Sequence, residues 1–512
     1  MPEEYVAAFD VGTTSCKGVL VGRDGSLLGG MDIPLETRYG QQGTGRTVEQ
    51  DPEQWFKAVA EIAGRWWYSG IDPKDVRLIA LSGQMQDCIP VDADGHPVRP
   101  AILYSDGRAA KQAARMLETL GEAPIREVTG NHLDGTLTLP KLLWLKENEP
   151  DAYERTASCL ISAKDFVIRR LTGRNVTDPT SASTAGMMDI SSRRWKADWL
   201  ERFGLDARKL PDLLASDEIA GEVVAEASAA TGFAEGTPVL CGIGDAGSTT
   251  IGAGATRPGD LYAYAGTTGW VAVTTNRVGP VERGVFHLAH ADRGLVIAVA
   301  PLLNAGNAHQ WALSVFGRGP SGKEGFAELE RMMAACDRRQ SGVIFLPYLN
   351  GERFPVQNPR ASGVFIGLTS STTAADMSCA VLEGVALAMY QVAEWVSRPS
   401  AVSAPSDRCK PSQVVLIGGV GQSRLFCQIF ADVFGTDVFV PADSQYLPAI
   451  GCAAAGFVRL GWAQLYESFA EAWLKQQKGE RFSPDEALTE VYRRKYAKFT
   501  KLYPALEALF DA

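Results

Sequence analysis

The sequence predicts an α/β protein made of two similar halves. Short β-prone runs alternate with stretches whose apolar residues recur at the 3.6-residue period of a helix. The segment FDVGTTSCKGVLV at 9–21 has a counterpart, AYAGTTGWVAVTT, at 263–275, and both place a Gly-Thr-Thr turn between β-prone flanks. Since the turns lie about half of the 512-residue chain apart, the similarity indicates duplication of one large fold and not a short solenoid repeat.

The first half is expected to open with strands and then a helix. Gly12-Thr-Thr-Ser makes the first turn between strands, and Asp24-Gly25 makes the next. At Asp51 the apolar period changes from two to 3.6, with Asp51 as expected N-cap, Pro52 as first helical residue and Gln54 as partner in a capping box. The predicted strands of this half cover 5–10, 16–21, 77–81 and 238–241.

The second half continues the alternation of strands and helices. Its predicted strands cover 295–300, 342–346 and 414–417, and its predicted helices cover about 373–395, 423–434 and 485–510. The Pro- and Ser-rich stretch 398–412 is expected to be a surface loop.

The composition is that of an ordinary globular protein. With 46% hydrophobic and 21% charged residues, a disordered or fibrous chain is excluded. Fifty basic against 60 acidic residues give a net charge of −10, which argues against nucleic acid or an anionic membrane as partner. The nine cysteines are scattered without a CxxC pair, and there is neither a basic leader nor a run of 18 apolar residues. We therefore expect a soluble protein of the reducing cytoplasm.

The loop after the first strand has the composition of a phosphate-binding turn. Asp10-Val-Gly-Thr-Thr-Ser-Cys-Lys17 combines a carboxylate, small residues, hydroxyls and a cation, so that the loop could wrap phosphate oxygens while Asp10 holds hydrated magnesium. The alternative is a plain hairpin turn. A second Gly-Thr-Thr at 266–268 and a strand-Gly-Gly-helix pattern at 418–423 favour a nucleotide polyphosphate held between two domains by loops of both.

One carboxylate is placed as a general base would be. Gly242-Ile-Gly-Asp245 follows a predicted strand, and its glycines allow close approach of a substrate. In phosphoryl transfer the protein mainly positions the reactants, and an Asp accepts the proton of the attacking hydroxyl. The alternative is that Asp245 caps the next helix, and both roles are compatible.

Other polar segments give weaker indications. Ser82 to Asp87 offers a cluster of side chains suited to a polyol pocket, near which Asp106 and Arg108 could pair, although a loop without a site fits equally well. The P-loop-like stretch 317–323 lacks the Ser or Thr that holds magnesium. His287 and His290 lie in a probable strand region and would face opposite ways, so that a shared metal site is not expected.

Together these segments resemble the FGGY family of carbohydrate kinases, and within it the xylulokinases. The resemblance runs over nearly the whole chain, in family order. The matching motifs are DVGTTS at 10–15, SGQM at 82–85, SDGR at 105–108, TGN at 129–131, PKLLWLKENEP at 140–150, GIGD at 242–245, GTTG at 266–269, FLPYLNGER at 345–353, GVFIGLT at 363–369, LEGVA at 382–386 and GG at 418–419.

The resemblance implies two ribonuclease-H-like domains of the actin and sugar-kinase superfamily, with MgATP and a sugar meeting in the cleft between them. We expect a sugar-binding domain with the first phosphate loop over 1–254 and a nucleotide-binding domain over 255–512. Asp245 would be the general base, Asp10 would orient magnesium, and Met85 and Gln86 would contact the sugar. The nucleotide would be contacted by Thr13, Thr14, Lys17, Gly266, Thr267, Gly306, Gln310, Gly419 and Ser423.

The chain departs from the xylulokinase pattern at two sugar-facing positions. That pattern has His where this chain has Gln86, and Asn where it has Ala246. Gln cannot become cationic and Ala offers no hydrogen bond, so that D-xylulose is the first expectation and ribulose, erythritol or another open-chain polyol the alternative.

Two further classes are weighed against a sugar kinase. One is a non-catalytic or chaperone-like ATPase of the same superfamily, which Asp245 and the sugar-pocket loop argue against. The other is a glycoside hydrolase, which needs a second carboxyl group about 5–9 Å from Asp245 and leaves the phosphate loops unexplained. No nucleic-acid or membrane partner is expected, and the resemblance makes a homodimer one possibility.

Overall fold

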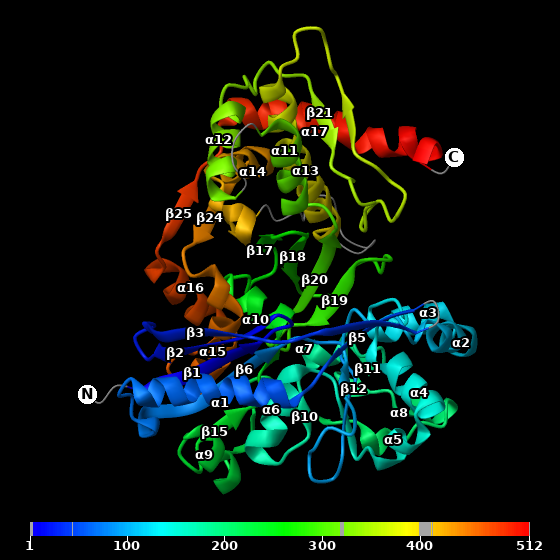
Figure 1. Ribbon diagram of the computed structural model, residues 1–512, viewed down its shortest axis with the longest axis vertical. Helices are drawn as coiled ribbons and strands as arrows, with labels where there is room; N and C mark the ends of the chain where they lie inside the picture. Colours follow the sequence, from blue (N-terminus) through cyan, green and yellow to red (C-terminus); the bar gives the residue numbers. More distant parts are fainter. Residues whose placement is uncertain (1–3, 43–44, 318–321, 399–410, 412, 511–512) are drawn as a thin grey trace.

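A computed structural model describes residues 4–42, 45–317, 322–398, 411 and 413–510. The chain forms two lobes stacked along its long axis, with the N-terminal half below and most of the C-terminal half above (Figure 1). The polar stretch 398–412 and the P-loop-like stretch 317–323 lie largely outside the described residues.

The N-terminal lobe is organised around a seven-stranded mixed sheet. β1 pairs antiparallel with β2 and parallel with β6. The strand order is β14 (Ile219–Glu222), β15 (Pro238–Leu240), β6 (Val76–Gly83), β1 (Tyr5–Val11), β2 (Ser15–Gly22) and β3 (Leu27–Pro34), with β16 (Ile243–Gly244) also paired to β6. The strands predicted for this half are confirmed.

The C-terminal lobe repeats this arrangement in a second seven-stranded sheet. β17 pairs antiparallel with β18 and parallel with β23, as β1 does with β2 and β6. The order is β19 (Phe286–Ala289), β20 (Val296–Leu302), β18 (Gly269–Thr275), β17 (Leu261–Ala265), β23 (Gln413–Ile417), β24 (Asp437–Pro441) and β25 (Gly479–Phe482). The two Gly-Thr-Thr turns thus join equivalent hairpins, which supports the duplication inferred from the sequence.

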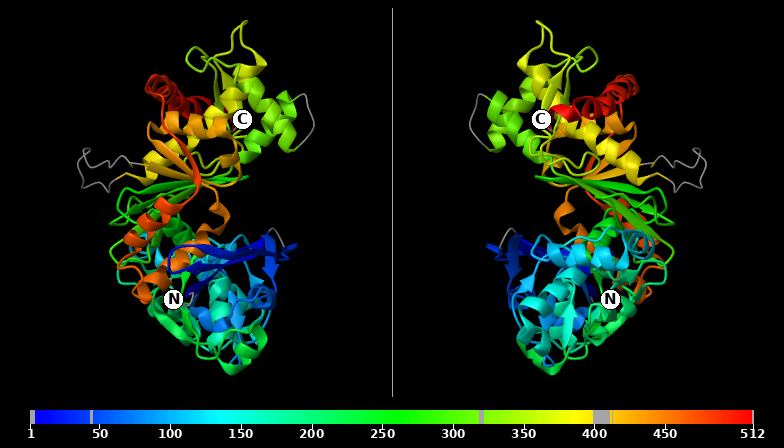
Figure 2. Two further views of the ribbon diagram at one scale, coloured as in Figure 1. Left: turned by 90° about the vertical axis from the view of Figure 1, so that its left-hand side faces the viewer. Right: turned by 90° about the vertical axis from the view of Figure 1, so that its right-hand side faces the viewer.

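Helices α10 (Asp245–Gly252) and α15 (Leu447–Arg459) pack on each other in the region between the two sheets (Figure 1). Although α15 comes late in the chain, it packs on β1 and β6 of the N-terminal sheet. One apolar cluster joins Val6 and Ala8 of β1 with Ile450 of α15 and Tyr262 of β17. Both side views in Figure 2 show the orange part of the second half reaching the N-terminal lobe.

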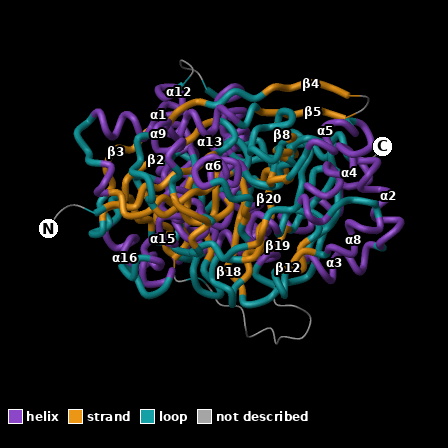
Figure 3. Tube along the Cα trace, turned by 90° about the horizontal axis from the view of Figure 1, so that it is seen from below, coloured by secondary structure: helices purple, strands orange, loops and turns teal. Residues whose placement is uncertain are grey.

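Helices α1 (Glu53–Tyr68), α6 (Ala163–Thr172) and α9 (Ala225–Thr231) share the apolar cluster on the other face of the N-terminal sheet. The smaller helices of this lobe are α2 (Ala110–Leu120), α3 (Glu122–Thr129), α4 (Thr138–Asn148), α5 (Pro150–Arg155), α7 (Pro179–Ala182) and α8 (Ala197–Arg202). The smaller sheets are β4 (Arg38–Gln42) with β5 (Gly45–Gln50) and β8 (Ala101–Ile102), β7 (Ile89–Val91) with β9 (Ser158–Leu160), β10 (Val176–Thr177) with β13 (Asp212–Leu213), and β11 (Met188–Asp189) with β12 (Arg194–Trp195). Figure 3 shows β4 and β5 along one edge of the molecule.

The core of the C-terminal lobe is built on one long helix. The helices of this half are α11 (Gly306–Phe316), α12 (Lys323–Met333), α13 (Ala374–Val396), α14 (Arg424–Phe434), α16 (Tyr466–Gln476) and α17 (Glu486–Phe510), beside the pair β21 (Ile344–Leu346) and β22 (Val364–Ile366). Among the described helices, α13 is the one long and apolar enough to cross a membrane, but 78% of that stretch is buried inside the fold. It is therefore placed as a core helix.

The predicted capping box at the start of α1 is wrong. The helix begins at Glu53 after Pro52, and the Asp51 carboxylate accepts a hydrogen bond from the Glu53 backbone N–H. The Gln54 side chain instead forms two hydrogen bonds with the backbone of Glu36, through Oε1 and Nε2. Gln54 therefore ties α1 to the segment after β3, an interaction between distant residues that has no local sequence signal.

Candidate active site

Three strand ends of the N-terminal sheet bring the predicted catalytic groups together. In the parallel register Asp10 of β1 lies beside Ser82 of β6, and Ile243 of β16 lies on the other side of Ser82. Because the carboxyl ends of parallel strands meet at one edge of a sheet, Asp10 and the Asp245 turn face the same region. The Ser82 hydroxyl donates to Asp10 Oδ1 over 3.0 Å.

A charged row crosses the first hairpin beside Asp10. The antiparallel registers pair Asp10 with Lys17 and Lys17 with Asp32, and directly opposed residues project from the same face of a sheet. Burial raises the pKa of Asp10, while the positive charge of Lys17 and the Ser82 hydrogen bond oppose that rise. The positive charge of Lys17 thus partly offsets the cost of burying the Asp10 carboxylate, a residue that is only 7% exposed.

Asp245 is the first residue of α10, and its side chain is partly buried. Gly244 occupies the N-cap position of α10, so the alternative that Asp245 caps this helix is wrong. The Asp245 Oδ1 atom instead accepts a hydrogen bond from the neighbouring Ala246 N–H at 2.7 Å. Burial and then the negative charge of Asp10 raise the pKa of Asp245 to about 7, against the opposing effect of the Ala246 hydrogen bond. A carboxyl group with that pKa is matched to proton transfer near neutral pH.

A buried charge network supports the backbone just before Asp245. The Asp178 carboxylate accepts from the Gly244 N–H at 3.3 Å and from Lys164 Nζ at 3.1 Å. Lys164 Nζ also donates to Asp165 Oδ1 at 2.6 Å and to the Cys241 carbonyl at 3.0 Å. No sequence pattern marks this network as a whole, although Asp178 before Pro179 has the pattern of an N-cap, and Asp178 does cap α7.

Six of the nine residues predicted to contact nucleotide meet at a cavity of about 900 Å³ in the C-terminal lobe. Its lining includes Gly266, Thr267, Gly306, Gln310, Gly419 and Ser423. The Gly306 N–H donates to the Gly266 carbonyl at 2.7 Å, and a Cβ at 306 would lie 2.5 Å from that oxygen. Only glycine allows this close contact between the two loops.

A neighbouring cavity of about 560 Å³ extends toward the N-terminal lobe. It is lined by Lys17 and Thr249 from the N-terminal half and by Gly419 and Tyr264 from the C-terminal half; these last two also line the larger cavity. Tyr264 stacks on Trp270 with ring centroids 3.9 Å apart. The two cavities together connect the C-terminal loops with the Asp10 hairpin.

Thr13 and Thr14 occupy the turn of the first hairpin but do not line either cavity. The Thr13 hydroxyl donates to Gln84 Oε1 at 3.0 Å, and the Thr13 carbonyl accepts from Gln50 at 2.6 Å. Thr14 is exposed. In this conformation Thr13 therefore connects the turn to the loop after β6.

That loop places Met85 and Gln86 next to the Asp245 turn. Met85 packs against Gly244, where an added Cβ would lie 2.3 Å from the Met85 sulfur. Gln86 has a left-handed backbone, with φ of 69°, and its side-chain amide donates to Thr136 Oγ1 at 2.7 Å. The buried Lys141 ammonium donates to the carbonyls of Gln86 and Leu103, and burial lowers its pKa to about 8.

The pair predicted between Asp106 and Arg108 is present. Arg108 Nη2 lies 2.6 Å from Asp106 Oδ2 and 2.7 Å from Glu49. Since Asp106 also accepts from the Val48 backbone N–H, the pair fixes this loop against β5.

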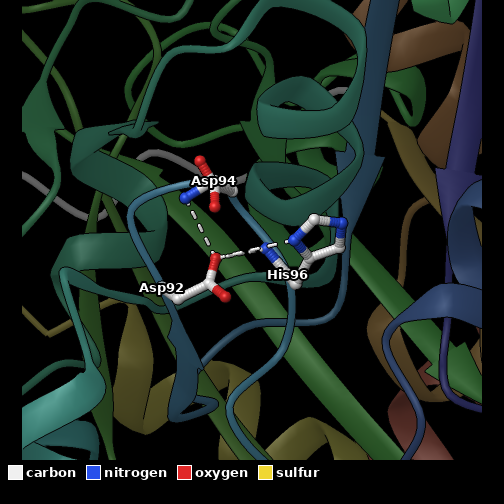
Figure 4. Close-up of side chains that lie close together, drawn as sticks. All are labelled: Asp92, Asp94 and His96. Atoms are coloured by element: carbon white, nitrogen blue, oxygen red, sulfur yellow. Dashed lines mark hydrogen bonds and ion pairs between the residues drawn. The ribbon is translucent and has the colours of Figure 1, made fainter.

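Among the described residues, His287 and His290 belong to no group whose ligand atoms lie close enough together to hold a metal ion. His287 Nδ1 contacts the Gly130 carbonyl, whereas His290 lies edge-on to Tyr466, as expected for residues that face opposite ways. The one group in the described chain with ligand atoms close together is Asp92, Asp94 and His96 (Figure 4). Asp92 Oδ1 accepts there from the backbone N–H groups of Asp94 and His96, so that the group is accounted for as an exposed turn.

Comparison with known proteins matches both halves of the chain to family models. Residues 5–252 match the N-terminal domain, and residues 261–460 the C-terminal domain, of the FGGY family of carbohydrate kinases. The chain belongs to the FGGY family of carbohydrate kinases. It is similar to the xylulose kinase of Klebsiella pneumoniae, 30% identical over 88% of this chain and 89% of the relative, and to that of Escherichia coli, 29% identical over 97% and 98%.

The same similarity holds for three-dimensional structure. The crystal structure of xylulose kinase from Rhodospirillum rubrum superposes with a TM-score of 0.87 at 26% identity, covering 99% of this chain and 100% of that one. The two-domain FGGY fold expected from the motifs is therefore confirmed. As an FGGY kinase, the chain is a phosphotransferase that uses ATP on a small carbohydrate.

Proposed function

We propose that this FGGY kinase phosphorylates a terminal hydroxyl of D-xylulose, giving D-xylulose 5-phosphate. The names of its relatives support this substrate. The observation that most supports the site is Asp245, a carboxyl group with its pKa raised to about 7, at the meeting point of the Met85–Gln86 loop and the Asp10 hairpin.

We propose that residues 1–254 bind the sugar and contribute the first phosphate loop, and that residues 255–512 bind the nucleotide. The larger cavity supports nucleotide contacts by Gly266, Thr267, Gly306, Gln310, Gly419 and Ser423, and the smaller one supports a phosphate contact by Lys17. Thr13 and Thr14 keep their proposed phosphate role on the position of their turn alone. Met85 and Gln86 are proposed to contact the sugar.

In the proposed mechanism Asp245 accepts the proton of the sugar hydroxyl as its oxygen attacks the γ-phosphorus of ATP. The new O–P bond forms while the bond from that phosphorus to the bridging oxygen breaks, and ADP leaves with the electron pair. The Asp178–Lys164 network holds the Gly244–Asp245 backbone in place. Approach of the lobes would exclude water and so favour transfer over hydrolysis.

The residues around Asp10 fit a magnesium ion. Mg²⁺ prefers oxygen ligands and takes one or two carboxylates besides substrate phosphates. One oxygen of Asp10 is engaged by Ser82, and the negative charge of Asp10 raises the pKa of Asp245, a repulsion that a bound cation would relieve. We propose that Asp10 holds the ion, which would neutralise charge on the transferred phosphoryl group.

The sugar end of the site suits a neutral substrate. Three carboxyl groups lie near one another there, because the charges of Asp10 and Asp87 each interact with Asp245. The two nearby buried cations are already bonded: Lys141 donates to two carbonyls, and Arg108 pairs with carboxylates. Neither of these two positive charges is therefore left free to bind an anionic sugar. Gln86 and Ala246 still distinguish this chain from the xylulokinase pattern. Ribulose, erythritol or another open-chain polyol is accordingly the alternative substrate.

We propose a cytoplasmic location with no nucleic-acid or membrane partner. A homodimer is proposed as one possible oligomeric state beside a monomer. The acidic composition supports this setting, and none of the eight described cysteines forms a disulfide. Family membership supports a phosphotransferase over the glycoside hydrolase and the non-catalytic ATPase considered above.

The test is ADP release with MgATP across pentuloses, hexuloses, tetritols and glycerol, for the wild type and Asp245→Asn. We expect D-xylulose to give the largest stimulation and Asp245→Asn to lose at least about 10²-fold in kcat, as for loss of a general base, with nucleotide binding retained. Asp94→Asn, at an exposed carboxylate of the same charge, serves as the matched control and should keep full activity. Near-normal turnover of Asp245→Asn would refute its role, and a different best sugar would replace xylulose.

A further inference from the structure

A third cavity, lined by none of the residues predicted for the active site, lies where the two lobes touch. There the β11–β12 hairpin of the N-terminal lobe contacts the loop between β19 and β20 of the C-terminal lobe (Figure 1). The cavity measures about 500 Å³ and has apolar walls that include Trp195 and Leu214. This volume is within the range of pockets that hold small ligands.

All the charged residues that line this cavity are arginines. Arg193 and Arg194 come from the hairpin and Arg293 from the opposite loop, while Ser191 and Ser192 add hydroxyl groups. Arg194 and Arg293 are exposed, and neither has a hydrogen bond or ion pair with any described residue. The negative charges of Asp292 and Asp178 act on Arg193, whereas no described carboxylate pairs with Arg194 or Arg293.

Arg193 ties the two lobes together at the cavity rim. Its Nη2 donates to the carbonyls of Asp292 and Leu295 at 3.0 and 3.4 Å, whereas its Nε and Nη1 groups have no partner among the described residues. Its backbone is left-handed, with φ of 53°, a conformation that is uncommon for a non-glycine residue.

The fold also holds like charges together at this point. Burial, and then the positive charge of Arg293, lower the pKa of Arg193, while the negative charges of Asp292 and Asp178 oppose that change. Two guanidinium groups near each other repel, and an anion between them would remove that repulsion. The repulsion between the like charges of Arg193 and Arg293 is a feature that a bound anion would compensate.

We propose that this cavity is a binding site for a phosphate group, either inorganic phosphate or the phosphate of a small monoester. A phosphate presents several acceptor oxygens and nearly two negative charges, which matches three planar guanidinium groups better than a single carboxylate does. The serine hydroxyls would complete the donor set, and Trp195 would bound the carbon part of an ester. This proposal does not depend on the identity of the sugar or on the role of Asp245.

The experiment is calorimetric titration of the full-length protein, saturated with ADP so that the nucleotide cavity is filled, with inorganic phosphate and separately with ribose 5-phosphate. The wild type is compared with the double variant Arg194→Ala/Arg293→Ala. Both replaced side chains are exposed, and an unchanged melting temperature will show that the variant is folded. The matched control is Arg202→Ala, an exposed arginine at the end of α8 that does not line the cavity.

We expect phosphate to bind the wild type and Arg202→Ala equally, and the double variant at least tenfold more weakly. Tighter binding of ribose 5-phosphate than of phosphate, lost in the double variant, would identify a monoester as the ligand, and equal affinity would identify the phosphate group alone. Absence of binding to the wild type, or equal binding by the double variant, would overturn the proposal.

Discussion

At the scale of single residues, the charge on Asp245 controls the chemistry proposed here. Its pKa is raised because the carboxyl group is buried near Asp10. A general base acts only when deprotonated, and the deprotonated fraction decreases as pH falls through the pKa. The same burial that makes Asp245 a proton acceptor near neutrality therefore limits the range of pH in which it works.

We predict that kcat/KM decreases on the acid side with a midpoint well above the value of 3.8 for an ordinary Asp and no higher than about pH 7, because a cation bound at Asp10 would relieve part of the repulsion that raises the pKa of Asp245. The measurement is kcat/KM between pH 5 and 9 in buffers of constant ionic strength. A profile that stays flat down to about pH 5 would show that Asp245 titrates as an ordinary carboxyl group, and would contradict the electrostatic account.

Gln86 is the residue at which sugar preference should be easiest to change. We predict that Gln86→His moves the ratio of kcat/KM values toward D-xylulose by about tenfold, because a polar group lost or gained at a buried sugar hydroxyl is worth roughly 1–3 kcal/mol. The measurement is the ranking of the sugar panel for both proteins. An unchanged ranking would remove Gln86 from the sugar pocket.

Among the residues, those with a local signal could be predicted and those defined by distant partners could not. Asp10 and Asp245 end apolar strands beside glycines, and their turns meet as expected. Lys164 and Asp178 lie on separate segments, and their ion pair over 3.1 Å leaves no pattern in the sequence. The spacing of Gln54 from Asp51 predicted a capping box, whereas its actual partner, Glu36, lies 18 positions away and leaves no local pattern.

At the scale of elements, the contact between α10 and α15 determines how closely the lobes pack. Gly451 of α15 crosses α10 so closely that an added Cβ would lie 1.8 Å from the Ser248 carbonyl oxygen. Helix α15 is rich in alanine and glycine, and small residues let two helix backbones approach. The two helices can therefore only stay in contact if position 451 has no side chain.

We predict that Gly451→Ala lowers the free energy of unfolding by about 1–3 kcal/mol, the usual cost of overpacking. Gly64→Ala is the matched control, since Gly64 lies in α1 with no atom within 4 Å of the added Cβ, and it should add about 0.5–1 kcal/mol. The measurement is denaturant unfolding of both variants. Equal stabilisation by both would show that α15 can move aside.

Element types could be predicted better than element partners. The alternation of strands and helices follows from local periodicity, and the predicted strands near 295–300 and 414–417 are confirmed. The sequence does not indicate that α15 belongs to the N-terminal sheet, because this helix is apolar on most sides and carries no mark of what it packs against.

At the scale of the whole molecule, the N-terminal lobe depends on the second half of the chain. The division at 254 that we propose places β1 and β6 in one domain and α15, which packs on them, in the other. A protein cut at that boundary would expose an apolar face of its main sheet.

We predict that a fragment of residues 1–254 is aggregation-prone and lacks a cooperative thermal transition. Adding the segment 444–478 in trans should increase its solubility, because that segment contains α15 and α16. The measurements are size-exclusion chromatography and thermal unfolding with and without the added segment. A monomeric fragment that unfolds cooperatively by itself would contradict the dependence.

The late position of α15 also affects how the protein is made. The ribosome adds about 5–20 residues per second, so that about 10–40 seconds separate the emergence of residue 254 from that of α15. During this interval the strands of the first half are complete but their covering helix has not been translated. We expect the nascent chain to need shielding by a chaperone at this stage, and clusters of slowly translated codons between the two halves would lengthen the exposure.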